Sequence, residues 1–153
     1  MFFITGMSTF TWVLLAYIGL HLGQEHIAPI KEFLHNTQGI DTLLEYPVLT
    51  HHINIKQDFV LRVREVFLIV GSLALFIEIA KAATASKFGA SETLLSFIVS
   101  MVFIVMFFMV SWAQNATFLI LGMMSLIDAT GGFIIELNAA RRDINVNSGG
   151  LLG

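Results

Sequence analysis

The chain has 153 residues, of which 56% are hydrophobic and only 12% are charged, whereas soluble domains contain about 45 to 50% apolar and about 25% charged residues. This composition argues against a water-soluble fold and predicts one all-α integral membrane domain over residues 1–153. The net charge of −3, with eight scattered Lys and Arg, gives no indication of nucleic-acid binding. The absence of cysteine excludes disulfides and thiolate metal sites.

Four apolar segments approach the roughly 20 residues that a helix needs to cross a bilayer. They cover residues 2–22, 66–83, 94–113 and 116–137. The first has no basic segment before it and no small-residue cleavage pattern after it, which favours a retained helix over a signal peptide. Little more than Gln114 and Asn115 separates the last two segments. We therefore predict a tight antiparallel hairpin, with Asn115 as the N-cap of the final helix.

The connection between the first two spans, residues 24–65, is far longer than the about two to eight residues common between bundle helices. Its first part has apolar residues at helical spacing beside charged ones, which predicts a short amphipathic surface helix. These apolar residues are Ile27, Ile30, Phe33 and Leu34. Pro47 and the polar run 50–58 then interrupt the pattern, and we expect no regular element there.

Basic residues beside the spans indicate the orientation of the chain. Arg141 and Arg142 directly follow the last span, and Lys81 and Lys87 follow the second, which predicts a cytoplasmic C-terminus. Four further basic residues would lie on the opposite side: Lys31, Lys56, Arg62 and Arg64. The tail 143–153, rich in Asn and Gly, is expected to be flexible.

Three charged residues lie inside the apolar segments: Glu78, Lys81 and Asp128. A carboxylate at the centre of a membrane helix costs about 2.5 to 3.5 kcal/mol on insertion scales, so such residues normally face protein or water. The two carboxylates lie equally far from the starts of their spans, Val66 and Ala116, which predicts a similar depth in parallel helices. Lys81 follows Glu78 by one turn and can pair with it. Structural pairing is the simpler interpretation, and proton or ion transport is the alternative.

The five histidines would lie on one side of the membrane, at the end of the first span or in the long connection. An imidazole of His21 or His26 and another of His51 or His52 could together hold haem or a metal ion. Their spacings match no strong metal motif, and interfacial histidines are usually ordinary amphipathic residues. We therefore expect no cofactor and keep haem or a metal as the alternative.

Small residues indicate where helices approach closely: Gly71 in the second span, and Gly122, Ser125 and Ala129 in the fourth. Such faces bind helices of the same chain or of another chain. Tyr17 near the end of the first span is predicted to lie in an interfacial aromatic belt.

No nucleophile and base at catalytic spacing and no glycine-rich phosphate loop stand out, so we do not expect an enzyme. The favoured hypothesis is a non-catalytic accessory or scaffolding subunit of a larger membrane complex. Its expected partners are the lipid bilayer and other membrane subunits or further copies of itself. The alternatives are a proton- or ion-coupled transport component that uses Glu78 and Asp128, and a haem- or metal-holding anchor of an electron-transfer enzyme.

Overall fold

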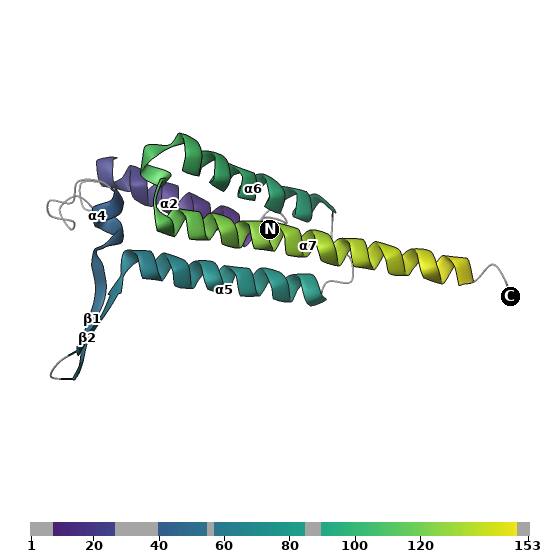
Figure 1. Cartoon of the computed structure of the whole chain (residues 1–153), viewed down its shortest axis with the longest axis horizontal. Coiled ribbons are helices and arrows are strands. Elements are labelled where there is room, and N and C mark those ends of the chain that lie inside the picture. The colour runs from purple at the N-terminus through teal and green to yellow at the C-terminus, as the bar shows by residue number, and fades with distance from the viewer. Residues whose placement is uncertain (1–7, 27–39, 55–56, 85–89, 150–153) are drawn as a thin grey trace.

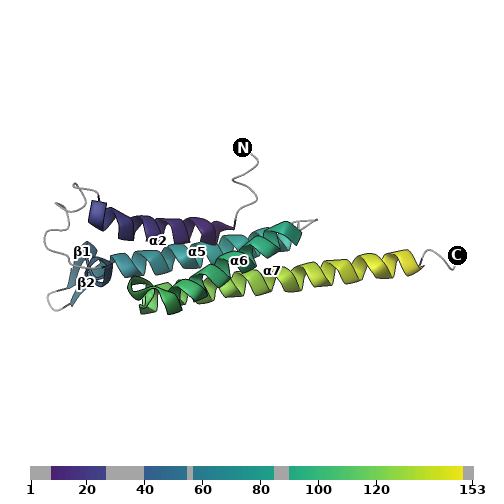
Figure 2. The same cartoon turned by 90° about the horizontal axis from the view of Figure 1, so that it is seen from above.

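The computed structural model describes residues 8–26, 40–54, 57–84 and 90–149 and is mostly helical (Figure 1). The elements in chain order are α2 (Thr9–His26), α4 (Ile40–Leu44), β1 (Pro47–Asn54), β2 (Gln57–Arg62), α5 (Val63–Thr84), α6 (Ala90–Met109), the 3-10 helix η1 (Ser111–Ala113) and α7 (Ala116–Gly149). The four long helices form an elongated bundle in which α5 and α7 run in the same direction and α2 and α6 run in the opposite one (Figures 1 and 2).

Two helices are long and apolar enough to cross a membrane, over Ser91–Met109 in α6 and Ala116–Asn138 in α7. The apolar part of α2, Thr9–Gly23, is shorter. Helix α5 has 22 residues, but charged side chains interrupt both of its ends. These are Arg64, Glu65, Glu78 and Lys81. By length and composition, two crossings are thus supported within the described residues.

An aromatic cluster joins α2, α5, η1 and α7 at one end of the bundle. The ring of Tyr17 lies 5.2 Å from that of Phe67, 6.3 Å from that of Trp112 and 5.1 Å from that of Phe118, measured between centroids. Tyr17 is fully buried, and its hydroxyl donates to Asn115 Oδ1 at 3.0 Å. Because this polar group finds a protein partner, Tyr17 belongs to the core of the bundle, and its position in an interfacial aromatic belt stays a prediction.

The side chain of Asn115 closes the turn between η1 and α7. Its Oδ1 accepts the backbone N–H of Phe118 at 3.0 Å, and its Nδ2 donates to the carbonyl oxygen of Trp112 at 3.1 Å. The first of these bonds satisfies one of the free N–H groups at the start of a helix. The predicted N-cap is therefore confirmed.

The small residues that were predicted to mark close helix contacts pack against other helices of the same chain. A Cβ atom at Gly71 would lie 2.5 Å from Cδ2 of Leu121, and one at Gly122 would lie 3.2 Å from Cβ of Phe103. Ser125 and Ala129, further along α7, are fully buried. The close approach of α5 to α7, and of α6 to α7, thus uses these faces inside the bundle.

The long connection contains a β-hairpin, so the prediction of a purely α-helical chain needs correction. Strands β1 and β2 pair in antiparallel register, with Thr50 opposite Val60 and His51 opposite Phe59. The β-branched side chains in this segment favour a strand, whereas its polarity led to the expectation of an irregular segment. The predicted surface helix falls within residues 27–39, outside the described residues.

The hairpin is attached directly to the start of α5. The backbone N–H of Val63 donates to the carbonyl oxygen of Tyr46 at 3.0 Å. The backbone N–H of Arg62 donates to the carboxylate of Glu65, which is one half of a capping box. This hydrogen bond holds the pKa of the Glu65 carboxyl below its usual range. Strand β2 and helix α5 are therefore continuous, with Glu65 at the junction.

Helix α7 continues to Gly149 and projects beyond the other helices (Figures 1 and 2). The expected flexible tail thus begins as helix, because residues 137–144 contain neither Gly nor Pro and include strong helix formers. Its 34 residues span about 51 Å at 1.5 Å per residue. A bilayer core is about 30 Å thick, so a substantial part of α7 would lie outside it.

Candidate functional site

The buried carboxylates of Glu78 on α5 and Asp128 on α7 line the same cavity, whose volume is about 300 Å³. Only 6% of Glu78 and 8% of Asp128 is exposed. The contact between Gly71 and Leu121, two helical turns earlier, sets the register of these parallel helices. Glu78 follows Gly71 by seven residues, and Asp128 follows Leu121 by the same number. The register that places Gly71 against Leu121 therefore also places Glu78 opposite Asp128.

Glu78 has partners on both of its oxygens. Oε1 accepts the backbone N–H of Thr9 at 2.6 Å and also the Thr9 hydroxyl, and Oε2 accepts from Nζ of Lys81 at 3.1 Å. Thr9 begins α2, where backbone N–H groups lack partners within the helix. The carboxylate therefore satisfies a helix start and a lysine together, and it joins α2 to α5.

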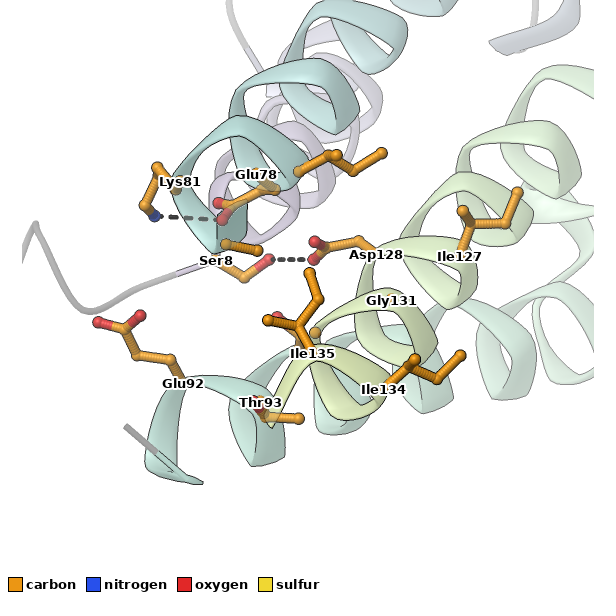
Figure 3. Close-up of a pocket in the computed structure, with 14 residues that line it drawn as sticks. Ser8, Glu78, Lys81, Glu92, Thr93, Ile127, Asp128, Gly131, Ile134 and Ile135 are labelled. Carbon is orange, nitrogen blue, oxygen red and sulfur yellow. Dashed lines mark hydrogen bonds and ion pairs between the residues drawn. The ribbon is translucent and has the colours of Figure 1, made fainter. Parts of the chain in front are cut away.

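Asp128 is held by two hydroxyl groups from other helices or their flanks. Ser8, just before α2, donates to Oδ2 of Asp128 at 3.4 Å, and the Ser96 side chain on α6 also forms a hydrogen bond with this carboxylate. Figure 3 shows Asp128 reaching from α7 toward Ser8, with the Glu78–Lys81 pair beyond. All four long helices or their ends thus contribute to the cavity.

The far side of the cavity carries two more polar side chains, from Glu92 and Thr93 in the first turn of α6 (Figure 3). Glu92 is partly exposed, whereas Thr93 is buried with 5% of its surface exposed. Among the described residues, the hydroxyl oxygen of Thr93 has no hydrogen-bond partner. An unpaired buried hydroxyl is unfavourable, so a hydrogen bond to a ligand or to water would stabilise this group.

A second pair of buried hydroxyls extends the polar character into the bundle. Ser100 lies one turn from Ser96 on α6, and Ser125 lies one turn from Asp128 on α7. Both are buried, and neither hydroxyl has a partner among the residues that the structure describes. Because Phe103 faces Gly122 and the helices are antiparallel, Ser100 and Ser125 lie at the same level. The interface between α6 and α7 therefore has a polar stripe that leads away from the cavity.

Sequence reasoning identified Glu78, Lys81 and Asp128, and the structure brings these three together. It missed the hydroxyl groups of Ser8, Thr9, Thr93 and Ser96. A signal for the last two was present, because Thr93 and Ser96 lie one turn apart in a helix that is mostly apolar. No comparable local signal existed for Ser8 or Thr9, whose contact with the carboxylates depends on tertiary packing.

The histidines do not join this site. His21 stacks on Trp112, with ring centroids 4.4 Å apart, and His51 lies exposed on β1 opposite Phe59. The side chains of His26 and His52 lie outside the described residues. Across the ranges that the structure describes, no group of three or more His, Asp or Glu side chains is placed to hold a metal ion. A haem or metal role stays a prediction.

Comparison of the chain with protein-family models, curated proteins and solved structures found no match. The chemistry of the site follows from its side chains. Ionised carboxylates only accept hydrogen bonds, and hydroxyls can both accept and donate. The cavity is therefore rich in acceptors and suits protons or cations.

Proposed function

We propose that the chain is a multi-pass membrane protein that crosses the bilayer four times, with its C-terminus in the cytoplasm. Large apolar side chains are exposed on every long helix, among them Trp12 on α2, Phe76 on α5, Phe108 on α6 and Phe133 on α7. Exposed apolar surface of this extent marks contact with lipid or with other proteins. The buried position of Glu78 supports a crossing by α5, because its charge faces protein and is paired with Lys81.

Within the membrane, we propose that it serves as a non-catalytic accessory or scaffolding subunit of a larger complex. The observation that carries this proposal is the β-hairpin, which projects sideways from the bundle (Figure 1). Within the described residues it is a sheet of two strands only, so neither outer edge is paired. An isolated two-stranded hairpin is marginally stable in water, and open strand edges readily pair with other chains.

The side chains of the hairpin also support binding to another protein. Four apolar residues on it are at least one-third exposed: Val48, Leu49, Phe59 and Val60. A surface that combines open backbone edges with apolar side chains fits a strand from another protein. The partner that we propose is therefore a neighbouring membrane subunit, docked on the hairpin at the end of α5 that is remote from the C-terminus.

Native mass spectrometry of the tagged chain, extracted gently from its own membrane, tests this proposal. We expect larger subunits to accompany the chain, and we expect replacement of Leu49 and Phe59 by Ser to release them. The matched control replaces Ile98 and Val105, similarly exposed on α6, by Ala. Recovery of the unmodified chain without other subunits, or equal retention of partners in the hairpin variant and the control, would contradict the accessory role.

The shared cavity favours a second candidate function, the handling of protons or cations at Glu78 and Asp128. Asp128→Asn separates the two candidates, because it removes a charge and nearly preserves the shape of the side chain. A scaffold with this change should assemble and support its complex normally. A proton- or ion-coupled component should assemble and lose activity.

A further inference from the structure

We propose that the cavity between α5, α6 and α7 binds a small ligand that carries an ammonium group. This inference deepens the cation-handling candidate by naming its ligand, and it does not depend on the accessory role. It rests on the balance of charges in the cavity, on an unpaired hydroxyl and on the shape and polarity of the walls.

The charged side chains that line the cavity are unequal in number. Among the described residues of the lining, Glu78, Glu92 and Asp128 are acidic and Lys81 is basic. The Lys81 amino group lies 3.1 Å from Oε2 of Glu78, the carboxylate that Thr9 also binds, and its charge acts on Asp128 as well. Asp128 is held by hydroxyl groups. The described lining therefore has more acidic than basic side chains, and a cation that enters the cavity would be attracted to its carboxylates, including the buried Asp128.

The hydroxyl of Thr93 supplies an independent indication of a ligand. It belongs to a buried residue that lines the cavity, and it has no hydrogen-bond partner in the part of the chain that the structure describes. An ammonium group has three N–H donors and no acceptor, so it can satisfy the Thr93 oxygen and the Asp128 carboxylate at once. Figure 3 shows these two side chains on different helices, with the cavity between α6 and α7.

The remaining walls suit the carbon part of such a ligand. Isoleucine side chains from α5 and α7 line the cavity: Ile79, Ile127, Ile134 and Ile135. Gly131 and Gly132 leave space beside them. A volume of about 300 Å³ lies at the lower end of the range for small-molecule pockets, about 300 to 1,000 Å³. A bare metal ion would leave most of this space and all of the aliphatic wall without contact.

Two sources could provide this chemistry: a free alkylamine, or the ethanolamine headgroup of a membrane lipid. The experiment uses the full chain in nanodiscs of phosphatidylcholine, whose headgroup has no N–H donor. Calorimetric titration with n-butylammonium chloride should give saturable binding, and titration with sodium chloride should give none. In nanodiscs that contain phosphatidylethanolamine, loss of butylammonium binding identifies the lipid as the source, and unchanged binding identifies the free amine.

Asp128→Asn should weaken butylammonium binding at least about tenfold, because hydrogen bonds to a charged partner are the strong ones. Asp41→Asn on α4 is the matched control, since Asp41 is exposed and lies outside the cavity. It should leave the affinity unchanged. Absence of binding to the unmodified chain, equal affinity in the two variants, or sodium binding as tight as that of the amine would overturn the proposal.

Thr93→Val provides a second variant with nearly the same volume, in case Asp128→Asn fails to fold. Loss of one hydrogen bond to the ligand should weaken butylammonium binding about two- to tenfold. Unchanged affinity in this variant would contradict the role of the Thr93 hydroxyl and the proposed orientation of the ligand. A chain that assembles with its subunits and binds no amine would overturn this inference and leave the accessory role standing.

Discussion

Thr9 and Glu78, 69 residues apart in sequence, are joined by two hydrogen bonds. Both the backbone N–H and the hydroxyl of Thr9 donate to Oε1 of Glu78, and Lys81 binds the other oxygen. The start of α2 is therefore fixed to the far end of α5. Glu78 also lines the cavity, so this contact determines several properties that can be measured.

Thr9→Val removes the hydroxyl and keeps the backbone donor. We expect the free energy of unfolding to fall by about 1.5 to 3 kcal/mol, the usual range for a hydrogen bond to a charged group. Thr11→Val is the matched control, because the Thr11 hydroxyl is buried without a partner and its removal should be neutral or stabilising. Reversible unfolding in mixed micelles measures both values. Equal effects of the two substitutions would contradict the assigned contact.

Gly71→Ala places a methyl group 2.5 Å from Cδ2 of Leu121 and 3.2 Å from Sδ of Met124. The resulting separation of α5 from α7 should lower the free energy of unfolding by about 1 to 3 kcal/mol. Gly19→Ala has open space around the new methyl group and should be neutral or stabilising by up to about 1 kcal/mol. The same unfolding assay compares them. If the Gly71 variant were as stable as the Gly19 variant, the close helix contact would be wrong.

Asn115→Ala removes the N-cap of α7 and leaves the buried Tyr17 hydroxyl without its acceptor. We expect the free energy of unfolding to fall by about 1 to 3 kcal/mol. Asn115→Asp keeps the acceptor oxygen and should lower the free energy of unfolding by less. Gln114→Ala changes the exposed neighbouring position, and its free energy of unfolding should stay within about 0.5 kcal/mol of that of the unmodified chain. Hydrogen exchange at the Phe118 amide should be fastest in Asn115→Ala, and exchange equal to that of the unmodified chain would exclude the cap.

Single cysteines test the proposed four crossings, because the chain has no native cysteine. We expect cysteines at Thr50 and Gln114 to react with an impermeant reagent from one side of the membrane, and a cysteine at Arg141 to react from the other side. All three positions are exposed. Labelling of Gln114 and Arg141 variants from the same side would contradict a full crossing by α7. Labelling of Thr50 and Gln114 variants from opposite sides would contradict the paired crossing of α5 and α6.

Glu65 should make the junction between β2 and α5 sensitive to acid. Because the folded-state pKa of its carboxyl is lowered, the ionised group contributes stability above the ordinary glutamate pKa. That contribution disappears as the pH falls through the lowered folded-state pKa. Glu65→Ala should therefore flatten the pH dependence of unfolding in this acidic window. An identical pH dependence in the variant and the unmodified chain would contradict the hydrogen bond from Arg62.

The features that followed from the sequence are those that depend on local pattern. Apolar runs predicted the long helices, and the position of Asn115 between two runs predicted a cap that its hydrogen bond to Phe118 confirms. The spacing of small residues on α7 predicted a packing face, and Gly122 lies against Phe103. In each case the determining residues lie within a few turns of one another.

The features that could not be predicted depend on contacts across the fold. The two donors of Thr9 meet Glu78 only after α2 packs on α5, and nothing beside Thr9 in sequence indicates this contact. The hairpin had a partial signal in the β-branched residues Val48, Thr50 and Val60, but its polar residues and the lack of a strong turn sequence concealed it. The burial of Tyr17 could not be predicted either, because its hydrogen-bond acceptor, Asn115, lies 98 residues away in sequence.

Because α5 and α7 lie parallel, the rotation of each helix about its axis decides whether Glu78 and Asp128 face the same cavity. Seven residues separate Gly71 from Glu78, and the same interval separates Leu121 from Asp128. One residue inserted into α7 within that interval would turn Asp128 by about 100° around the helix axis. The carboxylate would then leave the cavity and face the apolar exterior, although the composition of the helix would hardly change. An insertion inside this interval should therefore separate the two carboxylates.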